Sequence, residues 1–260
     1  MYRLGVLPHW EPGMPTAEPH ISLIVPAYNE ENYLARTLQG VNQAKEAYRD
    51  PSSIEVVVVN NMSTDRTELV ARSHGAQVLV EEKRCIAAVR NRGVRGSFGR
   101  IVAFLDADSL VSRNVFNAIQ ETMMSGKYIG GSTNVKLDRM SVGLFATMCL
   151  TVFPARLLFG VSGGLFFTER STFHELGGFD ERFYCAEDSA FLLALRKHGR
   201  RLRRGFRVLK NEVTITSSRS FDRFGDWYYL LNLPRILLHG GSRAFQSREF
   251  CNRYWYNPDR

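Results

Sequence analysis

The sequence predicts an α/β fold with a mostly parallel central sheet and helices on both of its faces. Its first half alternates short β-branched runs with segments whose apolar residues recur at helical spacing. Several of these runs are apolar throughout, which is typical of strands buried on both faces of a parallel sheet. Such alternation favours right-handed β-α-β crossovers within one sheet.

Each element of the first half has a local signal. The expected strands are residues 21–25, 54–59, 77–80 and 100–105. One expected helix carries Leu34 to Ala44, and a second ends at Ser73. A third covers Ile86 to Val94, and a fourth follows a Ser112 cap. Pro26 is expected to end the first strand, and Asn29 to cap the first helix. Gly75 is a good stop for the second helix.

The second half is less regular. Strands are expected at 128–137, 163–168 and 213–216, and helices at 169–176 and 187–198. Gly177-Gly178 and Gly199 are expected to end those two helices. The apolar run 142–153 is shorter than the roughly 20 residues of a bilayer span, so we expect a buried helix there. An interfacial membrane helix is the alternative. A second apolar run covers Trp227 to Leu238.

The composition of the 260 residues is that of an ordinary globular protein, with 44% hydrophobic and 23% charged residues. It excludes a disordered tail protein or a fibre. The four cysteines form no CxxC pair, so free thiols in a reducing cytosol are expected. No apolar segment of a secretory signal is visible near the start. We therefore expect a cytoplasmic protein, with the inner face of the membrane as the alternative location.

The chain is basic, with a net charge of +8. This charge is compatible with nucleic acid, anionic lipid or phosphorylated ligands. The cations are concentrated between Arg196 and Lys210. A solvated face on one helix and one strand explains this run equally well.

Polar clusters follow three of the predicted strands. They are Pro26-Ala27-Tyr28-Asn29-Glu30, the segment 60–65 that begins Asn60-Asn61, and Asp106-Ala107-Asp108. In a parallel α/β sheet, ligands bind beyond the carboxyl ends of the strands, so these clusters are expected at one edge. Two neighbouring carboxylates repel each other unless a proton or a cation intervenes. A hard divalent ion held by carboxylate and substrate phosphates would meet this need. The alternative is a surface turn in which Asp108 caps the next helix.

A further acidic pair, Glu187-Asp188, opens a predicted helix. Acidic residues at a helix N-terminus are mildly stabilising, which is one explanation. The other is a general base, which must reach the proton that it removes. No HExxH, P-loop or dinucleotide-binding motif and no GxSxG nucleophile elbow is present.

Taken together, these clusters resemble family 2 glycosyltransferases of the GT-A fold. The matching segments are 25–30, 57–67, 88–93, 104–108, 163–164, 177–180 and 187–188. The resemblance covers roughly 21–217 and implies a Rossmann-like nucleotide-binding half at about 21–110. It also implies an acceptor half at about 111–217. An N-terminal arm at 1–20 precedes the two halves, and an apolar C-terminal extension at 218–260 follows them.

The resemblance implies a nucleotide-diphosphate sugar donor of the UDP or GDP type, bound with Mn²⁺ or Mg²⁺. The residues that it assigns to the donor are Pro26, Ala27, Tyr28, Glu30, Asn60, Asn61, Lys83, Arg90, Asp106, Ala107, Asp108 and Arg219. Asp108 would ligate the metal, and Asp106 would touch the ribose or a metal-bound water. Asn60-Asn61 departs from the aspartate that usually stands in this segment. Arg219, or Arg223 near it, would lie over the diphosphate, with a solvent loop as the alternative.

The implied reaction is an inverting, metal-dependent sugar transfer. Asp188 resembles the base that takes the proton of an acceptor hydroxyl, and Glu187 would orient the acceptor or serve a helix cap. The acceptor would be a sugar, a small molecule or a lipid-linked molecule, with peripheral membrane contact through the apolar segments.

Three other functions compete with this reading. The Asn60-Asn61 departure motivates a catalytically silent nucleotide-sugar binding module, but Asp108 and Asp188 argue against it. A sugar-phosphate nucleotidyltransferase lacks support, because no Gly-rich basic loop follows the first strand. A nucleic-acid binder is motivated by the net charge alone, and the acidic strand-end edge disfavours it.

Overall fold

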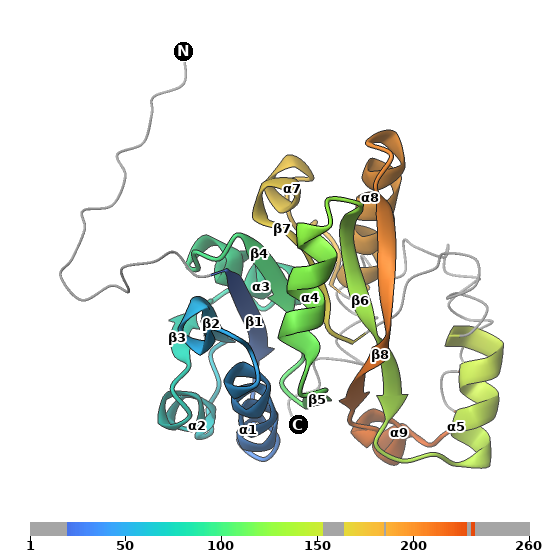
Figure 1. Ribbon diagram of the computed structural model, residues 1–260. Coiled ribbons are helices and arrows are strands. Elements are labelled where there is room, and N and C mark those ends of the chain that lie inside the picture. The colour runs from blue at the N-terminus through green and yellow to red at the C-terminus, as the bar shows by residue number, and fades with distance from the viewer. Residues whose placement is uncertain (1–19, 153–163, 185, 228–229, 232–260) are drawn as a thin grey trace.

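The computed structural model describes residues 20–152, 164–184, 186–227 and 230–231 (Figure 1). The expected N-terminal arm, apart from His20, and most of the apolar run from Trp227 to Leu238 lie outside the described residues. No described helix is long and apolar enough to cross a membrane.

The described strands form one eight-stranded sheet, with the order β3-β2-β1-β4-β7-β6-β8-β5. The first four strands are β1 (Ile21–Ala27), β2 (Ile54–Asn60), β3 (Gln77–Val80) and β4 (Ile101–Phe104). All neighbours among these four are parallel, which confirms the predicted parallel half. Their carboxyl ends therefore lie at one edge of the sheet.

The other half of the sheet mixes both strand directions. Its strands are β5 (Ser109–Val111), β6 (Tyr128–Leu137), β7 (Phe166–Glu169) and β8 (Gly205–Thr216). Strand β7 runs antiparallel to both β4 and β6, whereas β6 and β8 are parallel. The short edge strand β5 is antiparallel to β8 and joins the turn after β4 to the second half.

Helices cover both faces of this sheet (Figure 1). Their bounds are α1 Leu34–Glu46, α2 Thr67–Ser73, α3 Ile86–Arg95, α4 Val115–Met124, α5 Val142–Thr147, α7 Arg170–Glu175, α8 Glu187–Arg201 and α9 Arg219–Phe224. Pro51–Ser53 and Met148–Val152 form short 3₁₀ and π segments. Apolar residues of α1 and α4 share one core with the sheet, and those of α3, α7 and α8 share the other. The predicted arrangement with helices on both faces is therefore confirmed.

Strand β1 shows why the sequence produces two cores. Ile21, Leu23 and Val25 belong to the core under α1 and α4, whereas Ile24 belongs to the opposite one. Successive side chains of a strand point to opposite faces, so an unbroken apolar run fills both. Each fully buried side chain of this kind contributes about 1.5–3 kcal/mol.

Several boundary predictions in the first half of the chain are wrong. Strand β1 continues through Pro26, which pairs with Val59 of β2. This is tolerated because β4 ends opposite Ile24, so the missing N–H of Pro26 interrupts no pairing with β4. Asn29 does not cap α1, which begins after Tyr33. Likewise, α4 begins after Asn114 and not after a Ser112 cap.

The second half departs further from expectation. Helix α8 runs through Gly199 to Arg201. Glycine is required at 199 for close packing, since a Cβ there would lie 2.7 Å from the Arg204 carbonyl oxygen. Strand β8 begins at Gly205, eight residues before the strand expected at 213–216. The helix expected to be buried at 142–153 exposes 82% of Val142 and 62% of Phe145. Its described part is α5 and the π segment.

Candidate functional site

The loops after β1 and β2 are bonded to each other. Asn29 adopts a left-handed conformation with φ of 53°, and its Oδ1 accepts a 2.9 Å hydrogen bond from Thr64 N. Glu30 N donates to Thr67 Oγ1 at 2.8 Å. Segment 63–67 therefore ties the first two polar clusters into one unit.

Both asparagines at the end of β2 have defined partners. Asn60 Oδ1 accepts from Ser63 N at 2.9 Å and holds the turn. Asn61 Nδ2 donates to the carbonyls of Glu81 at 2.6 Å and Lys83 at 3.0 Å. An ionised aspartate only accepts hydrogen bonds, so it could not replace this pair of donations. These two donations explain why residue 61 is an asparagine and not an aspartate in this chain.

The Asp106-Ala107-Asp108 turn is fixed from two sides. Thr37 Oγ1 of α1 donates to the Ala107 carbonyl at 2.8 Å. Strand β5 starts directly after Asp108, at Ser109. Asp108 therefore does not cap the next helix, and the alternative of a simple capping turn is wrong.

Arg90 of α3 links this turn to the start of α8. Its Nη2 donates to Asp106 Oδ1 at 2.8 Å, and its Nη1 donates to Glu187 Oε1. Only 4% of the Arg90 side chain is exposed, against 52% for Asp106. Burial alone would lower the pKa of Arg90, and the nearby carboxylates outweigh it and raise that pKa. The guanidinium is thus a fixed positive charge between two acidic segments.

The acidic pair at the start of α8 contains two different environments. Ala186, with φ of 59°, precedes the helix and lets it begin at Glu187. Glu187 is 4% exposed, and burial raises its pKa to about 7 although Arg90 opposes this. Asp188 is half-buried, and its charge acts on both Arg90 and Glu187. The more accessible carboxylate of the pair is therefore that of Asp188.

Arg219 forms a second ionic bridge at this edge. Its two Nη atoms donate to the Glu30 carboxylate at 2.7 and 2.5 Å, and its Nε lies 3.0 Å from Asp108 Oδ2. Its guanidinium carbon lies 4.5 Å from the centre of the Tyr33 ring. The alternative that this arginine belongs to a solvent loop is wrong.

Tyr28 and Lys83, two further residues predicted to bind the nucleotide-sugar donor, each contact a charged side chain. The Arg84 guanidinium lies 3.9 Å above the Tyr28 ring, a contact that sequence reasoning missed. Lys83 Nζ lies 2.5 Å from Glu181 Oε2, so it reaches the loop that leads to α8. The sequence signal for the Arg84 contact was the basic pair Lys83-Arg84, which does not show which of the two side chains lies over Tyr28.

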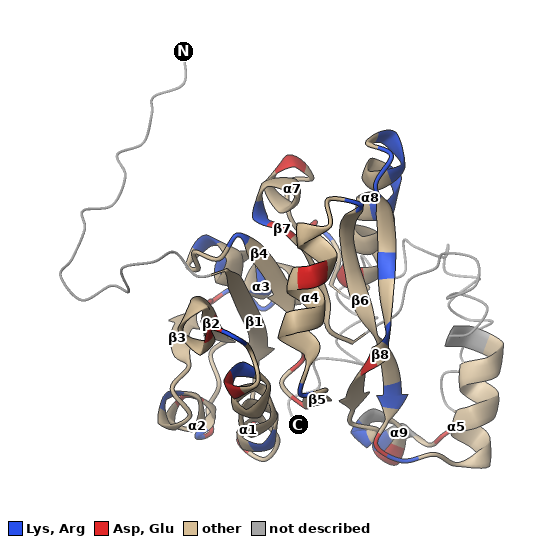
Figure 2. Cartoon of the chain, viewed as in Figure 1, with Lys and Arg blue, Asp and Glu red and all other residues tan. Residues whose placement is uncertain are grey.

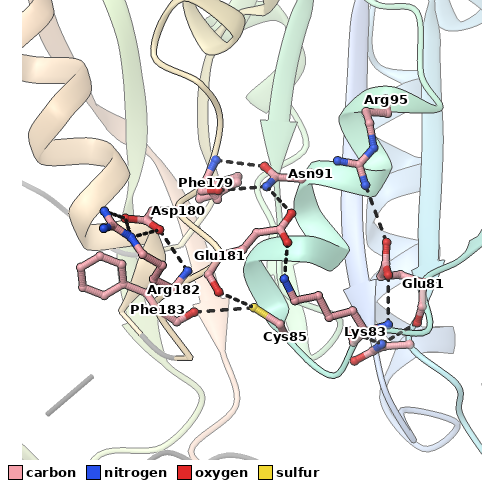
Figure 3. A network of polar contacts seen from close by, with 11 residues as sticks. Glu81, Lys83, Cys85, Asn91, Arg95, Phe179, Asp180, Glu181, Arg182 and Phe183 are labelled. Atoms are coloured by element: carbon pink, nitrogen blue, oxygen red, sulfur yellow. Dashed lines mark hydrogen bonds and ion pairs between the residues drawn. The ribbon is translucent and has the colours of Figure 1, made fainter. Parts of the chain in front are cut away.

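Figure 3 shows how α3 anchors that loop. Asn91 exchanges two 2.9 Å hydrogen bonds with the backbone of Phe179, one in each direction. The Cys85 thiol approaches the carbonyls of Glu181 and Phe183. Burial raises the pKa of this thiol. The predicted loop 177–180 is thus held against α3.

The basic run 196–210 lies away from these acidic residues. Figure 2 shows its lysines and arginines at the far end of α8 and along β8. Helix α8 spans 15 residues, so its basic end is roughly 20 Å from Glu187. The structure therefore does not bring this run into the candidate site.

The predicted metal ligands, Asp106 and Asp108, are suited to a cation whose remaining ligands come from the substrate. No group of three or more His, Cys, Asp or Glu side chains within the described ranges is placed to hold a metal. Mg²⁺ and related hard ions are instead bound through one or two carboxylates together with substrate phosphates. Asp106 and Asp108, two residues apart on one turn, fit that mode.

Sequence comparison matches residues 22–143 to the family model described as glycosyl transferase family 2. The putative glycosyltransferase EpsH of Bacillus subtilis is 30% identical over 99 residues, which cover 36% of this chain and 27% of that protein. Glycosyltransferase AglE of Haloferax volcanii is 37% identical over 101 residues, covering 36% of this chain and 32% of that protein. The matches thus span only about a third of these relatives, or less.

Solved structures resemble most of the fold. S. aureus TarS 1-349 aligns with a TM-score of 0.59 and 18% identity, covering 92% of this chain and 72% of that one. The mannosyltransferase PcManGT from Pyrobaculum calidifontis, in complex with GDP-Man and Mn²⁺, gives 0.61 and 19%, covering 89% and 64%. At these identities the likeness concerns the fold, which is that of GT-A glycosyltransferases. Residues 22–143 are thus similar to glycosyl transferase family 2.

Proposed function

We propose that this protein transfers a sugar from a nucleotide-diphosphate sugar to an acceptor hydroxyl, with inversion at the anomeric carbon. The family match supports a glycosyltransferase. Solved neighbours are complexes of TarS with UDP and with UDP-GlcNAc and of PcManGT with GDP-Man. A UDP- or GDP-type donor is therefore the proposed substrate class.

The observation that carries this proposal is the position of Arg90. It bonds Asp106 of the Asp106-Ala107-Asp108 turn and Glu187 of α8, which are 81 residues apart in the chain. The segment proposed to bind the donor diphosphate and the segment proposed to activate the acceptor therefore belong to one ionic cluster. A transferase needs this arrangement, because both substrates must meet at one point.

On the donor side, Pro26, Ala27, Tyr28 and Glu30 would line the base and ribose pocket. Asp106 and Asp108 would hold Mn²⁺ or Mg²⁺, which neutralises charge on a leaving diphosphate. The Arg84 guanidinium above Tyr28 adds a positive charge beside the proposed base pocket.

On the acceptor side, Asp188 is the proposed general base. Glu187 has the pKa nearer neutrality, but it is buried and bonded to Arg90. A base must first reach the proton that it removes, so geometry favours Asp188. Its carboxylate would take the hydroxyl proton as the acceptor oxygen attacks the anomeric carbon. Glu187 would orient Arg90, and through it Asp106.

A thermal-shift panel of UDP and GDP, each with and without Mn²⁺, tests the donor class. A nucleotide at 100 times its Kd stabilises the folded state by about 2.7 kcal/mol. We expect one of the two to raise the Tm, with a further rise on adding Mn²⁺ that Asp108→Asn removes. If neither nucleotide shifts the Tm with or without Mn²⁺, the proposed donor class is wrong.

We also propose peripheral membrane contact through the surface around α5. Met140, Val142, Phe145 and Leu150 are each more than half exposed there. Burying such side chains in lipid is favourable in proportion to their apolar area. Flotation with anionic vesicles should carry the protein upward, and a Val142→Ser/Phe145→Ser variant should lose this. Equal flotation of both proteins would contradict the contact.

A further inference from the structure

Arg219 uses three of its N–H groups on two carboxylates. Its Nη atoms contact both oxygens of Glu30, and its Nε contacts Asp108. A bidentate arginine–carboxylate pair is geometrically specific as well as strong. The contact to Asp108 is made by a different nitrogen, so the two carboxylates are held by separate atoms of one guanidinium.

The bridge joins three distant parts of the chain and lies largely out of solvent. Glu30 follows β1, Asp108 precedes β5, and Arg219 opens α9 beyond β8. The exposed fractions of their side chains are 5%, 14% and 24% respectively. Partly buried carboxylates require a nearby positive charge, and Arg219 supplies one to both.

Asp108 is also the carboxylate that the proposed function assigns to a divalent cation. The Asp108 carboxylate would therefore have two cationic partners, Arg219 before the divalent cation binds and the divalent cation afterwards. We infer that Arg219 is a positioning residue that serves as the internal counter-cation of Asp108 and Glu30. It holds both carboxylates in the protein without donor, and its Nε gives up Asp108 to an incoming divalent cation. Both Nη atoms stay on Glu30.

The physical basis is competition for one negative charge. A guanidinium 3.0 Å from a carboxylate lowers the affinity of that carboxylate for any other cation. The same effect is familiar for protons, where an opposite charge at 4–6 Å lowers a carboxyl pKa by 1–3 units. Removing the guanidinium should therefore tighten cation binding by about tenfold or more. A residue that merely fixed α9 would not have this effect.

Mn²⁺ binding to the full chain, followed by electron paramagnetic resonance without nucleotide, tests this inference. We expect Arg219→Gln to bind Mn²⁺ at least about tenfold more tightly than the wild type. The matched control is Arg182→Gln, which removes the same charge from an exposed pair with Asp180. We expect this control to bind as the wild type does. Binding to Arg219→Gln that is no tighter than to wild type overturns the inference.

A measurement on the wild type keeps the test independent of how the variant folds. Nitrogen-15 NMR resolves arginine Nε–H groups, and loss of one signal in Arg219→Lys identifies that of Arg219. Titration with Mg²⁺ should shift this signal and speed its exchange with solvent, because the Nε bond to Asp108 is lost. An Arg219 Nε–H signal unchanged at saturating Mg²⁺, or no Mg²⁺ binding, overturns the inference. Neither measurement involves sugar transfer, so failure of the proposed reaction is distinguishable.

Discussion

At the scale of single residues, two arginines account for how the acidic groups of the candidate site coexist. Arg90 lies between Asp106 and Glu187, and Arg219 lies between Glu30 and Asp108. Removing one partner of a buried ion pair leaves an uncompensated charge, which costs about 3–5 kcal/mol. Both arginines were singled out from the sequence by resemblance, but their carboxylate partners were not. Three of these four pairs join residues 97 or more positions apart, and spacing along the chain does not show which side chains meet over such separations.

The Glu187 carboxyl should make stability depend on pH. Its pKa rises from 4.5 to about 7 on folding, so the folded state binds more protons between these values. Stability is then highest below about pH 4.5 as far as this group is concerned, and falls as pH rises toward 7. The full fall would be up to about 3 kcal/mol.

Urea unfolding from pH 5 to pH 8 measures this slope. Glu187→Gln should show a flatter pH dependence than the wild type across that range, because glutamine does not titrate. The same slope in both proteins would show that Glu187 titrates alike in the folded and unfolded states.

The two asparagines after β2 should differ in their tolerance of aspartate. Asn61→Asp replaces a double donor with a group that faces two carbonyl oxygens, so it should cost about 1–3 kcal/mol. Asn60→Asp keeps the acceptor for Ser63 N and loses only a 3.4 Å donation to Glu68, whose side chain is 44% exposed, so as the control it should cost about 1 kcal/mol or less. Urea unfolding at pH 7 compares them. Equal costs would contradict the donor role of Asn61.

At the scale of elements, a segment was predictable where its own sequence decides its structure. The four parallel strands and the start of α8 at Glu187 were predicted because apolar runs and acidic helix starts are local signals. Strand β5 was missed, since three residues carry no period and its pairing with β8 is set by tertiary contact. The prediction of a helix stop at Gly199 is wrong because its close packing against Ile129 of β6 is a non-local reason for glycine.

Close packing of α3 against β1 gives an element-level prediction. A Cβ at Gly93 would lie 2.4 Å from Ile24 Cγ2, so Gly93→Ala should destabilise the fold by about 1–3 kcal/mol. A Cβ at Gly40 in α1 would lie 3.6 Å from Leu110 Cδ2, which is an ordinary van der Waals contact, so Gly40→Ala should stabilise the fold by up to about 1 kcal/mol. Opposite signs are expected in chemical unfolding. A neutral Gly93→Ala would contradict the tight contact.

At the scale of the whole molecule, the parallel half presents loops at one edge and the mixed half brings α8 and α9 to the same place. The first arrangement follows from the sequence, because parallel strands share their carboxyl-end edge. The second depends on β7 reversing direction beside β4, which no local pattern specified. Candidate residues were therefore identifiable by motif, whereas the bridges between the halves required the structure.

The central claim is that Asp188 acts on a substrate held by the Asp106–Asp108 turn. Single-turnover sugar transfer, measured together with donor Kd on Asp188→Asn, tests it most directly, with the remote Asp50→Asn as control. The account predicts that Asp188→Asn loses about 10²–10⁴ in rate while its donor Kd stays unchanged. A wild-type protein that binds donor without transferring sugar, or an Asp188→Asn variant that transfers at the wild-type rate, would contradict it.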